Sequence, residues 1–278
     1  VMTVFTQSSP IYKGKFMAKD SRLPIYRGGK VLDYNGLYSD YQEFGALQEY
    51  VITYDELIER SEDKHNKWME IVKGVGGDVS EVEKKNKLDI SWNPVKVNKV
   101  GSIEMRNMDM NFPSTLMAVA ILTKYAFRDI QRQEIEIIPD KRGIAEPFSY
   151  EEEGDRKMIF VPPFWYVNQR MQHDGAWQGL ENESVYDYCN GFWKLCLKFV
   201  NKKYYPALKP IKDMVKTRKT RSDEILDKVK KKGYDPKETI PEDILKEIVL
   251  DYSKKLRKDI EDNKELMENL TEGMRVWL

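Results

Sequence analysis

The sequence contains little cysteine and little histidine. Its 278 residues include 2 Cys and 2 His. Two thiols cannot form the disulfide framework of a small secreted protein, so the expected location is the reducing cytoplasm. A zinc site is not expected, because Cys189 and Cys196 are only two thiols and His65 and His173 lie far from them in sequence. We expect both cysteines to be small residues of the core.

An excess of charge of either sign is also missing. Lys and Arg number 46, Asp and Glu number 46, and the formal net charge is +0. Broad binding of nucleic acid or of a membrane surface needs a large positive field, so neither partner is expected and any anion site must be local. No apolar run reaches membrane-spanning length, and no signal peptide is visible. The chain opens on the apolar run Val-Met-Thr-Val-Phe, so we expect further residues before Val1 in the natural protein.

The composition is that of a folded protein, since 41% of the residues are hydrophobic and 33% are charged. The pattern of strand-like and helical segments predicts an α+β fold in one domain, residues 1–278, with a core of sheet and helix in 1–180 and a helical part in 181–278. A long helix is expected from Pro113 to about Gln133, because Pro is favoured in the first turn of a helix. An acidic loop is expected at 151–155. Strands are expected at 1–6, 88–97, 101–106, 134–139 and 158–161.

The strand that opens at Gly101 carries charge on one side. Ile103 and Met105 point one way and Glu104 and Arg106 the other. A carboxylate and a guanidinium are costly to bury unless something offsets the lost hydration, and a metal ion with a polyphosphate would do so. The alternative is an ordinary strand with a solvent face and a salt bridge.

Two further segments have the composition of ligand sites. Residues 20–29 combine Arg22 and Arg27 with two glycines. Either arginine could bind a ligand, because a guanidinium binds a carboxylate or phosphate with two hydrogen bonds. Residues 168–180 combine an amide, an arginine, His173 and glycines next to aromatic residues. The alternatives are solvated loop arginines and a structural histidine.

The glycine-rich loops that bind phosphate through the backbone are missing from the sequence, both the P-loop and the dinucleotide-binding form. A nucleotide would therefore be bound through a metal and arginine. Glu104 could hold Mg²⁺ through oxygen, and Arg106 could neutralise a transferring phosphoryl group.

Three segments of the chain, in order, resemble motifs of the carboxylate–amine ligases, also called second-type glutamate–cysteine ligases. Ser8-Ser9-Pro10, followed by Gly14 and Ser21-Arg22, is similar to the family's "SxSSP…G…SxR" segment. Residues 101–106 with Asp109 are similar to its "GTxExRxxD" strand, and residues 168–180 to its "N+xxAxxxGL" region, with Ala176 displaced. Each motif alone is weak, but the ordered set, spread over about residues 1 to 180, is more specific.

The resemblance implies a glutamine-synthetase-like fold, in which an antiparallel sheet curves into a funnel and is packed by helices. It implies an ADP-forming ligase that uses ATP and Mg²⁺. The γ-carboxylate of glutamate, or of a similar amino acid, is phosphorylated, and an amine such as cysteine then displaces the phosphate. By the same resemblance, Glu104 is a Mg²⁺ ligand, and Arg106 contacts the ATP phosphates or the acyl phosphate. Arg22 binds the substrate carboxylate, and Asn168 and Arg170 lie near nucleotide or substrate. A homo-oligomer is compatible with this reading.

Two departures leave other functions open. The family has an earlier Glu-x-Glu strand with most of the metal ligands, and nothing in this sequence matches it. The family's "DxRP" stands here as 89–94 without its arginine, so the amine acceptor need not be cysteine. One alternative is therefore a non-catalytic relative that binds nucleotide or a partner. Another is a guanidine kinase, which would form no amide.

Overall fold

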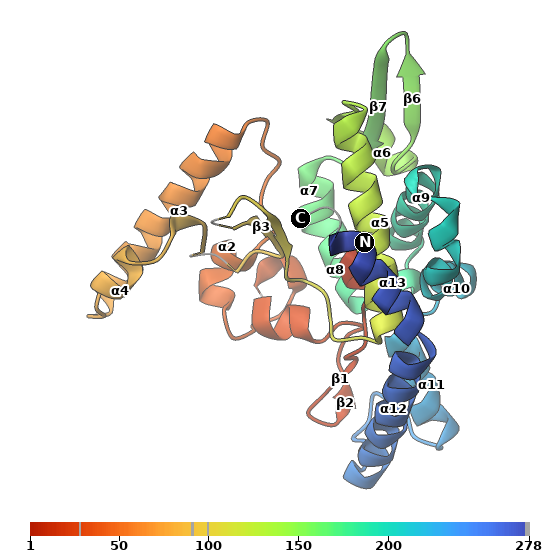
Figure 1. Ribbon diagram of the computed structural model, residues 1–278. Coiled ribbons are helices and arrows are strands. Elements are labelled where there is room, and N and C mark those ends of the chain that lie inside the picture. The colour runs from red at the N-terminus through yellow and green to blue at the C-terminus, as the bar shows by residue number, and fades with distance from the viewer. Residues whose placement is uncertain (28, 90–91, 99, 276–278) are drawn as a thin grey trace. The chain divides into compact units, whose positions relative to one another are not determined.

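The computed structural model describes residues 1–27, 29–89, 92–98 and 100–275 (Figure 1). The chain forms two compact units. Unit 2 is Leu23–Met108, and unit 1 is the rest of the chain on either side of it. Unit 2 is thus an insertion in unit 1. One domain, 1–278, with a helical part in 181–278, was predicted from the sequence and stays a prediction; the boundaries of the compact units fall after residues 22 and 108.

Unit 1 is built around the long helix α5, Pro113–Arg132, which packs against α9, α10 and α12. The buried residues of α5 recur at helical spacing and include Ala118, Val119, Leu122 and Ala126. One apolar stripe of the helix therefore faces these neighbours. The other helices of unit 1 are α1 Met2–Phe5, α6 Arg142–Ala145, α7 Phe164–Tyr166, η5 Val167–Met171, α8 Gln172–Trp177, η6 Gly179–Glu181, α9 Glu183–Phe199, η7 Lys202–Leu208, α10 Lys209–Thr217, α11 Arg221–Lys231, α12 Glu242–Asp262 and α13 Lys264–Arg275.

The strands of unit 1 form two small sheets. β1 Ile11–Tyr12 and β2 Lys15–Phe16 make a short hairpin. The other sheet has the order β5-β7-β6, in which β5 (Glu136–Pro139) is parallel and β6 (Tyr150–Glu153) antiparallel to β7 (Arg156–Val161).

Unit 2 is held by an aromatic core. Phe44 is fully buried, and its ring lies 5.1 Å from Trp68 and 5.6 Å from Trp92. Thr53 caps the long helix of this unit by accepting a hydrogen bond from the backbone N–H of Glu56. The elements of unit 2 are η1 Leu23–Arg27, η2 Lys30–Leu32, η3 Ser39–Tyr41, α2 Gln42–Gly45, α3 Tyr54–Gly74, α4 Ser80–Glu83, η4 Lys87–Asp89, β3 Val95–Val97 and β4 Ile103–Met105.

The α+β class is confirmed, as are the helix that begins at Pro113, the antiparallel pair β3–β4, and the helical character of the chain after residue 180. The predicted curved antiparallel sheet is not formed by the described residues. Their strands are short and are divided among three sheets, and the largest contains a parallel pair.

Two local predictions were wrong. Residues 1–6 were expected to be a strand, but Met2–Phe5 is helix, because a short apolar run fits a buried helical turn as well as a strand. The expected loop at 151–155 begins as strand β6, paired along Arg156–Val161, and the turn falls at Gly154, whose φ is 61°. β6 is an exposed edge strand made largely of Glu, so its sequence has no alternation of hydrophobic and polar residues from which a strand could be predicted.

No helix in the described part of the chain is both long enough and apolar enough to cross a membrane.

The two cysteines are free and buried, as predicted. Burial raises the pKa of the Cys189 thiol to about 11 and raises that of Cys196 as well. We therefore expect neither thiol of the native protein to react with a disulfide reagent at pH 8, and both to react after denaturation in guanidinium chloride. Fast labelling of either cysteine without denaturant would contradict this account of the core.

Candidate functional site

Residues 7–22 of unit 1, which carry the first ligase-like motif, are bonded to the third motif segment. The Gln7 side chain donates a hydrogen bond to the carbonyl of Gly175 at 2.6 Å. The backbone N–H of Asp20 donates to the carbonyl of Ala176 at 3.0 Å. Both acceptors lie in helix α8, so the two segments meet although about 160 residues separate them.

Asp109 joins the same segment to the second motif. One of its carboxylate oxygens, Oδ2, accepts hydrogen bonds from the backbone N–H of Ser8 at 3.1 Å and from the Ser9 hydroxyl at 2.5 Å. The backbone N–H of Asp109 donates to the Thr6 hydroxyl at 3.1 Å. A buried carboxylate needs several donors of this kind, and here the Ser-Ser pair supplies them.

Arg22 lies between two carboxylates. Its Nε is 3.0 Å from Oδ1 of Asp109, and its Nη2 is 3.3 Å from Oδ2 of Asp20. Asp20 is fully buried, and this burial raises its pKa to about 6 although Arg22 acts to lower it; the nearby Asp109 raises it further. The Arg22 side chain is 34% exposed to solvent. A substrate carboxylate would have to compete with two aspartates for this guanidinium.

Asn168 and Arg170 lie in the π-helical segment η5, which is continuous with α7 and α8. π-helical turns are uncommon and frequently accompany functional sites. The Asn168 side-chain oxygen accepts a hydrogen bond from Gln172 at 2.7 Å. Arg170 is 65% exposed, and its Nε is 3.6 Å from Asp174, which also contacts His173 at 3.1 Å. These side chains are thus on or near the surface of unit 1.

Glu104 and Arg106 belong to unit 2. As predicted, they lie on the same side of β4, with Nε of Arg106 3.5 Å from Oε1 of Glu104. The second oxygen of Glu104 is 3.8 Å from Nζ of Lys96, its cross-strand neighbour on β3. Glu104 is 41% exposed. The carboxylate therefore lies between two cations.

The β3–β4 hairpin buries its charged side more than its apolar side. The Lys96 side chain is only 7% exposed, whereas Val95 and Ile103, which point the other way, are exposed. The usual arrangement is the reverse, with apolar side chains inside. A buried lysine opposite Glu104 is the feature of unit 2 that most suggests a use for these charges.

No known family model, curated protein or solved structure matches this chain.

The described residues do not form a metal centre by themselves. Within residues 1–27, 29–89, 92–98 and 100–275, no group of three or more His, Cys, Asp or Glu side chains could hold a metal ion. Glu104 offers one carboxylate, and both of its oxygens already face cations. Resident Mg²⁺ held by protein ligands alone therefore does not fit, although a metal that arrives with a nucleotide needs few protein ligands.

The structure brings together some of the predicted residues and adds others. Arg22 is part of a buried cluster with Asp20 and Asp109, neither of which was proposed as a site residue. Asp109 was visible as the last residue of the quoted motif. Lys96 was missed, because only the register of β3 against β4 reveals that it faces Glu104.

The raised pKa of Asp20 predicts a pH effect on stability. Its folded pKa of about 6 exceeds the ordinary value of 3.8, so the native state holds a proton that the unfolded state releases, and stability falls as pH rises from about 4 to about 6. A shift of about two units corresponds to about 3 kcal/mol. Relative to wild type, Asp20→Asn should therefore gain up to about 3 kcal/mol in free energy of unfolding between pH 4 and pH 7.

Urea titrations of wild type and Asp20→Asn between pH 4 and pH 7 measure the difference in their free energies of unfolding. The control is Asp155→Asn in the exposed turn between β6 and β7, which should stay parallel to wild type. A difference between Asp20→Asn and wild type that does not change with pH would contradict the burial of an ionisable Asp20.

Proposed function

We propose that this chain is an ATP-dependent carboxylate–amine ligase. The γ-phosphoryl group of ATP passes to the γ-carboxylate of glutamate, or of a similar amino acid, and ADP leaves. The nitrogen of an amine such as cysteine then attacks the acyl carbon, the carbon–nitrogen bond forms, phosphate departs and the amine releases a proton. The low cysteine content leads us to propose a cytoplasmic location.

One observation carries this proposal. Three segments that resemble ligase motifs, far apart in the sequence, are joined through residues 7–22. Asp109 bonds to Ser8, Ser9 and Arg22, and the carbonyls of residues 175 and 176 bond to the same segment. Motif matches that arose by chance would not be expected to meet in this way. The antiparallel β3–β4 pair carries Glu104, but the curved sheet that the resemblance implies is not formed by the described residues.

In this proposal Mg²⁺ enters as the magnesium complex of ATP and is treated as part of the substrate. Glu104 would supply one oxygen ligand to that metal. Arg106 and the buried Lys96 lie beside Glu104 and would stabilise negative charge on the transferring phosphoryl group. Of these three charged side chains only Lys96 is buried, and Glu104 is 41% exposed.

We assign Arg22 a positioning role, because its guanidinium is bonded to Asp20 and Asp109. Held in this way, it joins residues 7–22 to Asp109 within unit 1. The exposed Arg170, with Asn168 on the same π-helical turn, remains the candidate for contact with nucleotide or substrate phosphate.

A second candidate function is a non-catalytic nucleotide-binding or partner-binding relative. The observation in its favour is that the described residues contain no group of three or more potential metal ligands. The two candidates differ in one outcome, because such a relative would bind Mg²⁺-ATP and release no ADP.

The test of the ligase proposal is ADP release from the protein as its gene encodes it, mixed with ATP, Mg²⁺, glutamate and a panel of amines. ADP should form only when both glutamate and an amine are present. Glu104→Gln keeps the size of the side chain and removes its charge, and we expect it to lower the rate about 100-fold or more.

Glu81→Gln is the matched control. Glu81 is an exposed glutamate of the same unit, paired with Lys84 at 2.7 Å, and its loss should leave the rate unchanged. Equal rates for Glu104→Gln and wild type would refute the role of Glu104. ATP binding without turnover in wild type would favour the non-catalytic relative.

A further inference from the structure

Two Asn-Gly pairs occur in the sequence, Asn35-Gly36 and Asn190-Gly191. In such a pair the backbone nitrogen of the glycine can attack the side-chain amide of the asparagine, because glycine has no side chain to hinder a close approach. Neither pair contains a candidate site residue of the ligase proposal. The two pairs lie in different local structures, so each serves as a comparison for the other.

The first pair belongs to unit 2. Asn35 is exposed and lies with Gly36 in the loop between η2 and η3. The backbone N–H of Gly36 donates to the Tyr34 carbonyl at 3.1 Å. That carbonyl also accepts from the backbone N–H of Gly29 at 2.6 Å and from the Ser39 hydroxyl at 3.4 Å. A carbonyl oxygen has two lone pairs, so three donors compete for it and the N–H of Gly36 is held weakly.

The second pair belongs to unit 1 and lies in the interior of helix α9. In a helix the backbone N–H of each residue is bonded to the carbonyl four residues earlier, and the backbone dihedrals are fixed. A Cβ added to Gly191 would lie 2.2 Å from the carbonyl oxygen of Pro147, so the helix is packed closely at this point. The nitrogen of Gly191 therefore becomes free to attack Asn190 only when the helix opens.

We propose that Asn35 is a site of spontaneous deamidation, with water as the co-reactant, and that Asn190 is protected. The nitrogen of Gly36 gives up its proton and attacks Cγ of Asn35. A nitrogen–carbon bond forms, and the side-chain amide nitrogen leaves as ammonia. Water then opens the resulting cyclic succinimide at either carbonyl carbon, which gives aspartate or isoaspartate at position 35 and adds one negative charge. This reaction goes beyond the ligase proposal and does not depend on it.

The two products have different effects on unit 2. Aspartate changes only an exposed side chain, whereas isoaspartate adds a methylene group to the backbone just before Gly36. Gly36 is closely packed, because a Cβ added to it would lie 2.3 Å from the carbonyl oxygen of Pro24 and 2.4 Å from that of Ile25. The next residue, Leu37, donates its backbone N–H to the Ile25 carbonyl at 2.7 Å. Isoaspartate should therefore disrupt this packing, and aspartate should not.

Peptide mapping by mass spectrometry of the whole protein, after incubation at pH 8, tests the proposal. In the native protein, deamidation at Asn35 should be at least about tenfold faster than at Asn190, because only Asn190 requires a helix to open. In guanidinium chloride that difference is lost, and both sites should react at similar rates. Native deamidation at Asn35 should also be slower at pH 6, because the attacking nitrogen must lose its proton.

Asn35→Gln is the matched variant. Its longer side chain would have to close a larger ring, so we expect no deamidation at position 35 and unchanged behaviour of Asn190. Asn35→Asp reproduces the aspartate product and should unfold in urea at the same midpoint as fresh wild type. The isoaspartate form, separated from aged protein by chromatography, should unfold at a lower midpoint.

Two results would overturn the proposal. One is that Asn35 of the native protein stays intact over a time in which it deamidates in guanidinium chloride. The other is that Asn35 and Asn190 of the native protein react at equal rates. Equal midpoints for the isoaspartate form and Asn35→Asp would overturn the effect on packing that we assign to the backbone around Gly36.

Discussion

A buried ion cluster holds the chain at the point where it leaves unit 1 and where it returns. Arg22 is the last residue before the insertion, Asp109 is the first after it, and Nε of Arg22 is 3.0 Å from Oδ1 of Asp109. Bringing together the ends of a long insertion costs conformational entropy. The ion pair, with the hydrogen bonds of Ser8 and Ser9 to the same carboxylate, offsets that cost. Removing one partner would leave a buried charge unpaired, which typically costs 3–5 kcal/mol.

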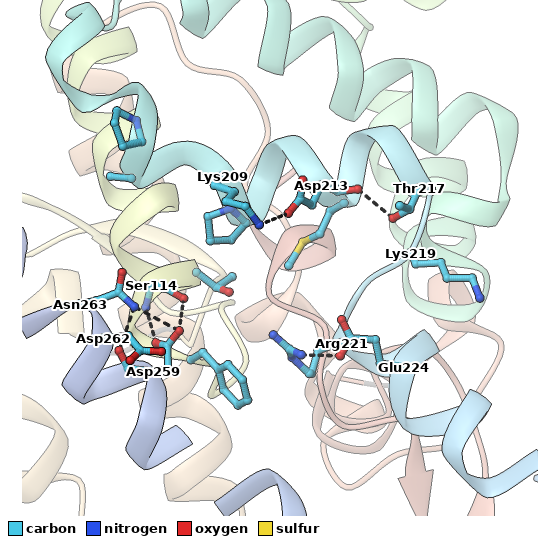
Figure 2. Close-up of a pocket in the computed structure, with 16 residues that line it drawn as sticks. Ser114, Lys209, Asp213, Thr217, Lys219, Arg221, Glu224, Asp259, Asp262 and Asn263 are labelled. Atoms are coloured by element: carbon cyan, nitrogen blue, oxygen red, sulfur yellow. Dashed lines mark hydrogen bonds and ion pairs between the residues drawn. The ribbon is translucent and has the colours of Figure 1, made fainter. Parts of the chain in front are cut away.

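The charges of unit 1 are of two kinds. Lys19, Asp20 and Asp109 are buried and paired; Lys19 contacts Asp223 of α11 and lies 3.1 Å from Glu181. The Asp223 carboxylate also caps α11 by accepting from the backbone N–H of Thr220 at 2.7 Å. Arg221 at the start of α11 and Asp259 and Asp262 at the end of α12 have the sign that the helix dipole disfavours. The second kind is paired as well, because Arg221 contacts Glu224 and Asp259 accepts hydrogen bonds from Ser114 (Figure 2).

Local sequence patterns predicted part of this structure. The helix that begins at Pro113 and the β3–β4 pair follow from periodicity and from proline chemistry, and both are confirmed. The helical turn at Met2–Phe5 was missed because a short apolar run has no period that distinguishes helix from strand. Of the site, Arg22, Glu104 and Arg106 were predicted from residue type. Their partners Asp20 and Lys96 were not, because burial and cross-strand register are tertiary properties.

The central claim is that Arg22 and Asp109 stabilise unit 1 through each other. A double-mutant cycle of Arg22→Met, Asp109→Asn and the double variant, followed by urea unfolding at pH 7, measures this coupling directly. The account predicts that each single variant is strongly destabilised and that the double variant loses less than the sum, with a coupling energy of about 1–3 kcal/mol. Additive losses, with no coupling energy, would contradict it.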